Sequence, residues 1–273
     1  LKDRVGYTLS AVHVEQGIRG EESLRDAAFA EELCGRLGVA CTVYHVCVPE
    51  YAASHKMGEE EAARTLRYDC LKKEAQAYPG RRVRIALAHH ADDNAETVLF
   101  WLARGSGLKG SGGIRPKREL IPDVMVIRPL LFAQREEILR ELAGRGQTYC
   151  EDGTNVQLAY SRNRIRHEIL PQLRRINPQA AAHIAACAET MSELSDYLEE
   201  ETARILPSVC VRLGEETGRP AWLLMETLTD YPAVLKKAVI YRVLCEAAGS
   251  SRDIGSVHVE AVLDFFRHQT GQR

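Results

Sequence analysis

The chain has 273 residues, and its 36 Lys and Arg residues against 38 Asp and Glu residues give a formal net charge of −2 at pH 7. This length can bury a sizeable core and predicts more than one domain, while the charge excludes a uniformly basic nucleic-acid coat but leaves room for a local basic face. No apolar run approaches the roughly 18 residues that a bilayer requires, so we expect a cytoplasmic protein without a membrane contact.

The first half of the chain alternates between two kinds of segment. Strands are predicted at 8–14, 39–48, 83–88 and 124–127, and helices at 21–37, 59–77 and 91–103. Strands that alternate with helices of this length are typical of parallel βαβ units. The pattern therefore predicts an α/β fold with a doubly wound, Rossmann-like parallel sheet.

The second half of the chain has a different pattern, because no strand is predicted from about Arg135 onward. Helices are predicted at 135–145, 161–173, 179–206 and 232–248. A change of composition near Leu206 and Pro207 indicates a boundary before a small helical C-terminal domain. We expect one domain over 1–177, a helical linker over 178–206 and a second domain over 207–273.

The eight cysteines are scattered and form no C-x-x-C pair of the kind used in zinc, redox or iron–sulfur sites. Most fall within apolar or helical patterns. We therefore expect buried free thiols in a reducing compartment.

The segment at 86–97 is the best place to look for an active site. A predicted buried strand ends in two histidines and passes into a helix whose first turn carries Asp92 and Asp93. Ligands bind where strand ends meet helix N-termini in open α/β sheets. One Asp there is explained by helix capping, but two adjacent carboxylates repel each other, and Glu96 returns to the same helix face. These three carboxylates suit Mg²⁺ or an ammonium group.

His89 and His90 raise the alternative of a transition-metal site. Adjacent strand residues point to opposite faces, so both cannot easily reach one ion. The sequence therefore favours a carboxylate site over a zinc site.

Two basic segments follow this run. The glycine-rich loop at 104–113 is either a phosphate-binding loop or a flexible surface loop. A surface loop is favoured, because a P-loop requires a preceding strand and none is predicted there. The other segment holds five arginines without lysine: Arg162, Arg164, Arg166, Arg174 and Arg175. It is either a solvated face or a surface for phosphate, which guanidinium groups bind well.

Several motifs in order resemble those of the bacterial tRNA(Ile)-lysidine synthetases, a family of N-type ATP pyrophosphatases. The resemblance covers nearly the whole chain. It rests on residues 13–19 (HVEQGIR), 63–68 (ARTLRY), 89–97 (HHADDNAET), 104–107 (RGSG), 127–131 (IRPLL), 151–155 (EDGTN) and 162–166 (RNRIR). It identifies 1–177 as the pyrophosphatase domain and 207–273 as a helical domain that contacts tRNA.

The resemblance implies a carbon–nitrogen ligase. ATP adenylates the C2 carbonyl oxygen of the wobble cytidine in an isoleucine tRNA with a CAU anticodon. The ε-amine of free L-lysine then attacks C2 and expels AMP to leave lysidine. The codon read changes from AUG to AUA. The implied cofactors are ATP and Mg²⁺. A homodimer is the assembly that the resemblance leaves open.

The resemblance also implies roles for individual residues. Asp92, Asp93, Glu96 and Arg67 are expected to be catalytic, with Asp92 and Asp93 as candidate Mg²⁺ ligands. Arg64 and Arg67 would stabilise phosphate charge, against the alternative of ordinary helix solvation. The expected substrate-binding residues are His89, Arg64, Arg128, Asn155, Arg162, Asn163 and Arg166.

One family motif is missing from the printed sequence. The Ser-Gly-Gly-x-Asp-Ser pyrophosphate loop follows the family's first strand and would lie before Leu1, so we expect both ends of this sequence to be incomplete. Two other functions stay open. One is a related pyrophosphatase that modifies tRNA, and the other is an inactive module that binds nucleotide or RNA; the coding sequence upstream of Leu1 would separate them.

Overall fold

The computed structural model describes residues 6–150, 161–216, 219–250 and 254–268. The chain divides into two compact units, Leu1–Thr97 with Ile114–Ala182, and Val98–Gly113 with His183–Arg273. In the part that the structure describes, no helix is long and apolar enough to cross a lipid bilayer.

The first unit contains two small sheets. Strand β1 (Ser10–Glu15) pairs in parallel with β2 (Ala40–His45). Strand β3 (Val83–Ala86) pairs in parallel with β5 (Val124–Ile127), whose other edge pairs in antiparallel fashion with β4 (Lys117–Ile121). Among the described residues β1 and β3 are not paired, so the parallel strands lie in two sheets.

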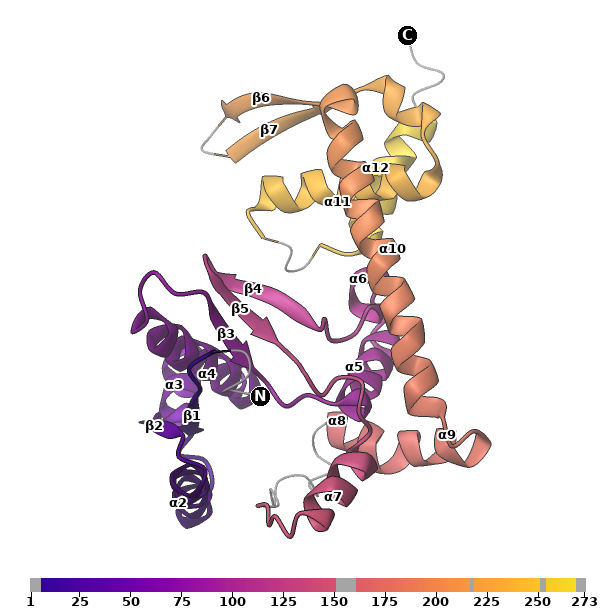
Figure 1. Ribbon diagram of the computed structural model, residues 1–273. Helices are drawn as coiled ribbons and strands as arrows, with labels where there is room; N and C mark the ends of the chain where they lie inside the picture. Colours follow the sequence, from indigo (N-terminus) through magenta and orange to yellow (C-terminus); the bar gives the residue numbers. More distant parts are fainter. Residues whose placement is uncertain (1–5, 151–160, 217–218, 251–253, 269–273) are drawn as a thin grey trace. The chain divides into compact units, whose positions relative to one another are not determined.

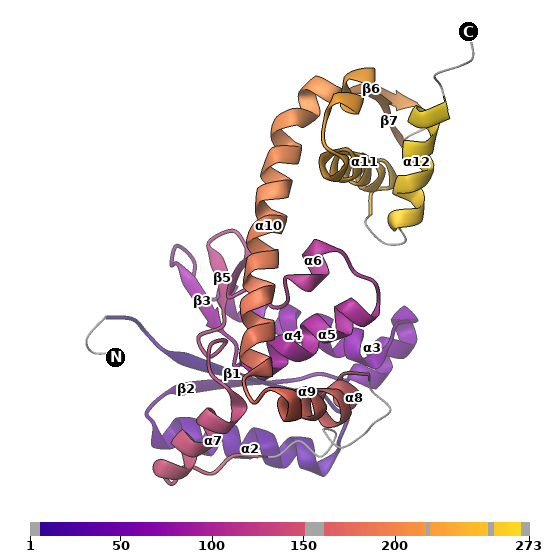
Figure 2. The same cartoon turned by 90° about the vertical axis from the view of Figure 1, so that its right-hand side faces the viewer.

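Helices cover both faces of the β1–β2 pair. α2 (Glu21–Arg36) lies on one face and α4 (Glu59–Gln76) on the other (Figure 1; Figure 2). α3 (Val48–His55) packs against α4, and together they bury Val48, Ala52, Ala62 and Ala63. Small residues at this contact let the two helices approach closely.

The turn after β1 depends on Gly17. Its φ is +66°, and a Cβ there would lie 3.1 Å from the carbonyl oxygen of Val46. Glycine alone adopts this left-handed conformation freely. The Gly17 amide donates to Oε1 of Glu15 at 2.7 Å, which holds that buried carboxylate at the carboxyl end of the strand.

The helix α5 (Ala91–Ala103) follows β3 after a short link. The Ala91 amide donates to the carbonyl oxygen of Ala133 at 2.8 Å, so the start of α5 is fastened to the loop between β5 and α7 (Arg135–Gly144). The C-terminal part of α5 belongs to the second unit.

Another helical run in the first unit contains a π-helical turn. α8 (Ser161–Arg164) continues into the π-helical turn Ile165–Ile169 and then α9 (Leu170–Ile176). In a regular α-helix the ring of Pro171 would collide with the carbonyl group of His167. The Leu170 amide instead donates to the carbonyl oxygen of Ile165, five residues back, and this wider turn accommodates the proline.

The second unit is mainly helical and has its own core. It contains α6 (Leu108–Ser111), most of α10 (Ala180–Val209), the hairpin β6 (Cys210–Glu216) and β7 (Arg219–Leu224), a 3₁₀ turn at Glu226–Asp230, α11 (Ala233–Ala248) and α12 (Ser256–His268). The core side chains are Ile205, Val209, Cys210, Leu228, Val239, Ile240, Val243, Val259 and Leu263.

Most predicted elements are confirmed, and the elements at 91–103 and 124–127 have the predicted lengths. The prediction that no strand follows Arg135 is wrong, because β6 and β7 pair there. The expectation of buried thiols also fails for most of the eight cysteines. All eight are unbonded, but only Cys70 and Cys210 are buried.

Candidate active site

The first turn of α5 is fixed by reciprocal hydrogen bonds between His90 and Asp93. The His90 amide donates to Oδ2 of Asp93 at 3.0 Å, and the Asp93 amide donates to Nδ1 of His90 at 3.4 Å. Side chains that accept from amides without a helical partner are what stabilise a helix N-terminus. This pattern leaves Oδ1 of Asp93 for other contacts.

Asp92 holds neighbouring segments against α5. Its Oδ2 accepts from the Arg135 amide at 2.8 Å, and its Oδ1 accepts from Nη2 of Arg174 on α9. Only 4% of the residue is exposed. Both carboxylate oxygens therefore have partners within the first unit.

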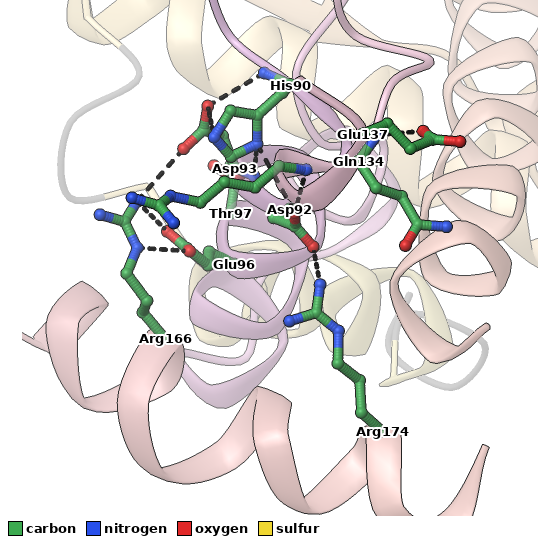
Figure 3. A network of polar contacts seen from close by, with 10 residues as sticks. His90, Asp92, Asp93, Glu96, Thr97, Gln134, Glu137, Arg166 and Arg174 are labelled. Atoms are coloured by element: carbon green, nitrogen blue, oxygen red, sulfur yellow. Dashed lines mark hydrogen bonds and ion pairs between the residues drawn. The ribbon is translucent and has the colours of Figure 1, made fainter. Parts of the chain in front are cut away.

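Glu96 lies one turn further along α5 and faces Arg166, which belongs to the π-helical turn (Figure 3). The Arg166 Nε donates to Oε1 at 2.7 Å, and its Nη2 donates to Oε2 at 2.9 Å and to Oδ1 of Asp93 at 3.2 Å. One guanidinium group thus pairs with two carboxylates. Such a two-pronged contact is the strong form of an Arg–carboxylate pair.

Burial raises the pKa of the Glu96 carboxyl group above its ordinary value, and the nearby Asp93 charge adds to this. The hydrogen bond and the charge of Arg166 act in the opposite direction. The pKa of Arg166 is raised, chiefly by its hydrogen bond to Glu96. Because Glu96 is only 3% exposed, its charged form depends on a cation beside it.

A pocket of about 330 Å³ opens beside this cluster and is lined by Arg64, Arg67, Tyr68, Leu87, Ala88, His89 and Asp93. Its walls come from α4, the end of β3 and the start of α5. One end is cationic and the other ends at a carboxylate. A second pocket of similar volume lies at the end of β1 and shares Arg67 and Leu87 with the first.

Arginines surround Tyr68 at the cationic end. The Arg118 guanidinium lies 4.7 Å from the ring centroid and that of Arg64 lies 5.3 Å from it. Burial acts to raise the pKa of the Tyr68 hydroxyl, but the hydrogen bond from Arg118 and the charges of Arg118, Arg64 and Arg128 lower it overall. This end of the pocket suits an anion.

His89 also lines the pocket. Burial lowers the pKa of the His89 imidazole, and the charge of Arg128 lowers it further. Its Nδ1 is buried without a hydrogen-bond partner among the described residues. A neutral ring with an unpaired nitrogen can accept or donate one hydrogen bond to a ligand.

The structure brings together most of the residues expected at the site. Arg64, Arg67, His89 and Asp93 line the pocket, with Glu96 and Arg166 directly behind Asp93. Arg128 is buried beside the pocket, where its charge acts on Tyr68 and His89, and it donates to the Arg115 carbonyl oxygen at 2.5 Å. Two expected residues on α8 are not in the pocket lining: Arg162, whose Nη1 lies 3.3 Å from Oε1 of Glu60, and Asn163 beside it. Asn155 lies outside the described residues.

Four further residues belong to the cluster: His90, Tyr68, Arg118 and Arg174. The first two stand within motifs that the sequence singled out. Arg174 lies in the predicted basic segment, but no local sequence pattern predicts its contact with Asp92, which is 82 residues away. Arg118 lies on β4, a strand that was not predicted.

The carboxylates do not by themselves form a metal site. In the described ranges, no group of three or more His, Cys, Asp or Glu side chains could hold a metal ion. Both oxygens of Asp92 accept hydrogen bonds, and those of Asp93 contact the His90 amide and Arg166. Within the described residues, the donor set therefore does not complete a Mg²⁺ site.

Known proteins resemble the chain in family, sequence and fold. The PP-loop domain family matches residues 1–173. The chain is 38% identical to a tRNA(Ile)-lysidine synthase of Bacteroides thetaiotaomicron over 232 residues, which cover 82% of the chain and 52% of that protein. It is 34% identical to the tRNA(Ile)-lysidine synthase of Dehalococcoides mccartyi over 280 residues, which cover 100% of the chain and 58% of that protein. The chain thus spans about half the length of the curated relatives it matches.

One solved structure shares the fold. The U34-tRNA thiolase NcsA from Methanococcus maripaludis, solved with its [4Fe-4S] cluster, matches with a TM-score of 0.55 at 20% identity. The match covers 68% of this chain and 62% of that one. The likeness supports the α/β fold assigned to the first unit.

Proposed function

The chain belongs to the PP-loop domain family, and from this premise we propose that the full-length protein is a tRNA(Ile)-lysidine synthetase. It would join the ε-amine of L-lysine to C2 of the wobble cytidine in a tRNA with a CAU anticodon, at the cost of ATP. The observation that carries the proposal is the pocket with arginines at one end and Asp93, backed by Glu96, at the other.

The carboxylate end suits the amino acid. We propose that Asp93 and Glu96 bind the ε-ammonium group of lysine, because the buried Glu96 carboxylate demands a cation and Asp93 lies beside it in the pocket lining. The amine must lose a proton before it attacks C2. Glu96 is the better proton acceptor of the two, since burial raises its pKa. Asp92 is proposed to act as a positioning residue that keeps α5, α7 and α9 together.

The cationic end suits the leaving group. Attack of the amine forms the C2–N bond, breaks the bond between C2 and the adenylate oxygen, and releases AMP. We propose that Arg64 and Arg67 stabilise the phosphate charge of that adenylate and that His89 forms one hydrogen bond to it, since all three line the pocket. ATP would bring Mg²⁺ on its phosphates, which agrees with the lack of a complete ligand set on the described residues.

The most direct test of the activity is transfer of labelled lysine. The full-length protein is incubated with ATP, labelled L-lysine and a tRNA(Ile) transcript carrying CAU. The expected result is ATP-dependent label in the tRNA with AMP released in equal amount. The absence of label when ATP is present and the tRNA is bound would refute the proposal.

Arg162 provides a test of the predicted RNA contact. It is half-buried on α8 and lies next to Asn163, and we propose that Arg128, Asn155, Arg162 and Asn163 bind the tRNA. In Arg162→Ala, the slope of log affinity for tRNA against log salt concentration should fall by about one, because one phosphate contact is lost. The matched control is Arg145→Ala on α7, an exposed arginine paired with Glu141. Equal slopes for wild type and Arg162→Ala would show that Arg162 is part of a solvated face.

A further inference from the structure

Arg166 occupies the same carboxylates that the proposed function assigns to the ligand. Its guanidinium group contacts both oxygens of Glu96 and Oδ1 of Asp93 (Figure 3). A guanidinium group and an ammonium group carry the same charge, and both donate several hydrogen bonds to carboxylates. Both cannot fill this position together.

The two sides of the ion pair differ in their access to water. The Glu96 side chain is 5% exposed, whereas that of Arg166 is 31% exposed. Arg166 can therefore regain water when it leaves, whereas Glu96 cannot remain charged without a cation. The groups that face Glu96 are Arg166, Asp93 and His90, and Arg166 is the one carrying a permanent positive charge.

The π-helical turn explains how Arg166 and Arg174 both reach α5. Eight residues of regular α-helix rotate by about 800°, which would set the two side chains about 80° apart. A single extra residue in a π turn absorbs roughly one step of 100°, so that both face the same side. Arg174 pairs with Asp92, which is not in the pocket lining, and so α9 stays attached if Arg166 leaves.

We infer that Arg166 is a displaceable stand-in for the ligand's ammonium group. In the ligand-free protein it neutralises Glu96 and Asp93. When an amine binds, Arg166 moves away and its positive charge becomes available to an anionic partner such as the RNA backbone. This inference rests on the proposed function, because it takes the ligand to be a primary ammonium.

The test is calorimetric binding of L-lysine to the full-length protein at pH 8 without tRNA. Because Arg166 competes with the ligand, Arg166→Ala should bind lysine at least about 5-fold more tightly than wild type. Arg164→Ala is the matched control, since Arg164 lies on the same helical run but is exposed and pairs with Glu168. It should leave the affinity unchanged.

A second readout separates competition from a structural role. Without Arg166 the pKa of Glu96 should rise further, so that lysine binding to Arg166→Ala releases protons as the pH is lowered. The binding heat should then depend on the ionisation heat of the buffer in that variant and much less so in wild type. Arg166→Lys, which keeps a cation, should restore the wild-type pattern if Arg166→Ala proves poorly folded.

The outcomes are distinguishable. If wild type and every variant fail to bind lysine, the proposed function fails. If wild type binds lysine but Arg166→Ala binds it equally or more weakly and shows no proton release, the stand-in inference fails while the proposed function stands.

Discussion

Glu96→Gln in the full-length protein is expected to lower lysine-dependent modification of tRNA at least about 100-fold. Glu96 is almost fully buried and accepts two hydrogen bonds from Arg166. An amide keeps the shape but loses the charge that holds an ammonium group. Loss of one partner of a buried, hydrogen-bonded charge pair costs about 2–5 kcal/mol, which corresponds to roughly 30- to 5,000-fold.

The measurement is the initial rate of label transfer from lysine to tRNA, together with the tRNA dissociation constant. The dissociation constant should change little, because Glu96 is proposed to contact lysine and not the tRNA. Glu168→Gln is the matched control, since Glu168 is exposed and pairs with Arg164. A Glu96→Gln enzyme that modifies tRNA at nearly the wild-type rate would remove Glu96 from the mechanism.

Asp92→Ala is expected to lower the stability of the fold more than any other exchange in the carboxylate cluster. It deletes the acceptor for the Arg135 amide and leaves the Arg174 guanidinium without its partner. Because the Arg174 side chain is 28% exposed and can regain water, we expect a loss of about 2–3 kcal/mol. For a unit of this size the midpoint of thermal unfolding should fall by roughly 4–12 °C.

Two further variants show whether the lost stability comes from the contacts of Asp92. Asp92→Asn keeps an acceptor for the Arg135 amide and should lose about half as much stability. Asp69→Ala removes an exposed carboxylate that pairs with Lys72, and it should change the free energy of unfolding by less than about 0.5 kcal/mol. A midpoint for Asp92→Ala equal to that of wild type would show that Asp92 does not hold these segments together.

The sequence predicted the position of the candidate site well because its signal is local. An apolar strand, two histidines and a helix with an acidic first turn follow one another directly in the sequence. The helix α5 begins and ends at the predicted residues. Spacing on one helix also placed Asp93 and Glu96 together. Glycine at position 17 is needed for a left-handed turn, and it too falls within a motif noticed in the sequence.

The contacts between distant segments could not be predicted in this way. Arg166 meets Glu96 across 70 residues, and nothing local distinguishes it from Arg164, which is exposed. Strand β4 was missed because it is short and begins with two basic residues, and Pro220 argued against a strand where β7 forms. Pro171 marks the position of the π-helical turn in the sequence. A proline alone, however, does not predict whether a helix ends there or continues through a π-helical turn.

Recognition of an ammonium group by Asp93 and Glu96 is the central claim, and competition between lysine and norleucine tests it most directly. Norleucine has nearly the same shape but lacks the terminal amine. In the full-length protein, norleucine should displace labelled lysine at least about 100-fold more weakly than unlabelled lysine does, because its side chain has no ammonium group to pair with Asp93 and Glu96. Displacement by norleucine within a few-fold of lysine would contradict the account.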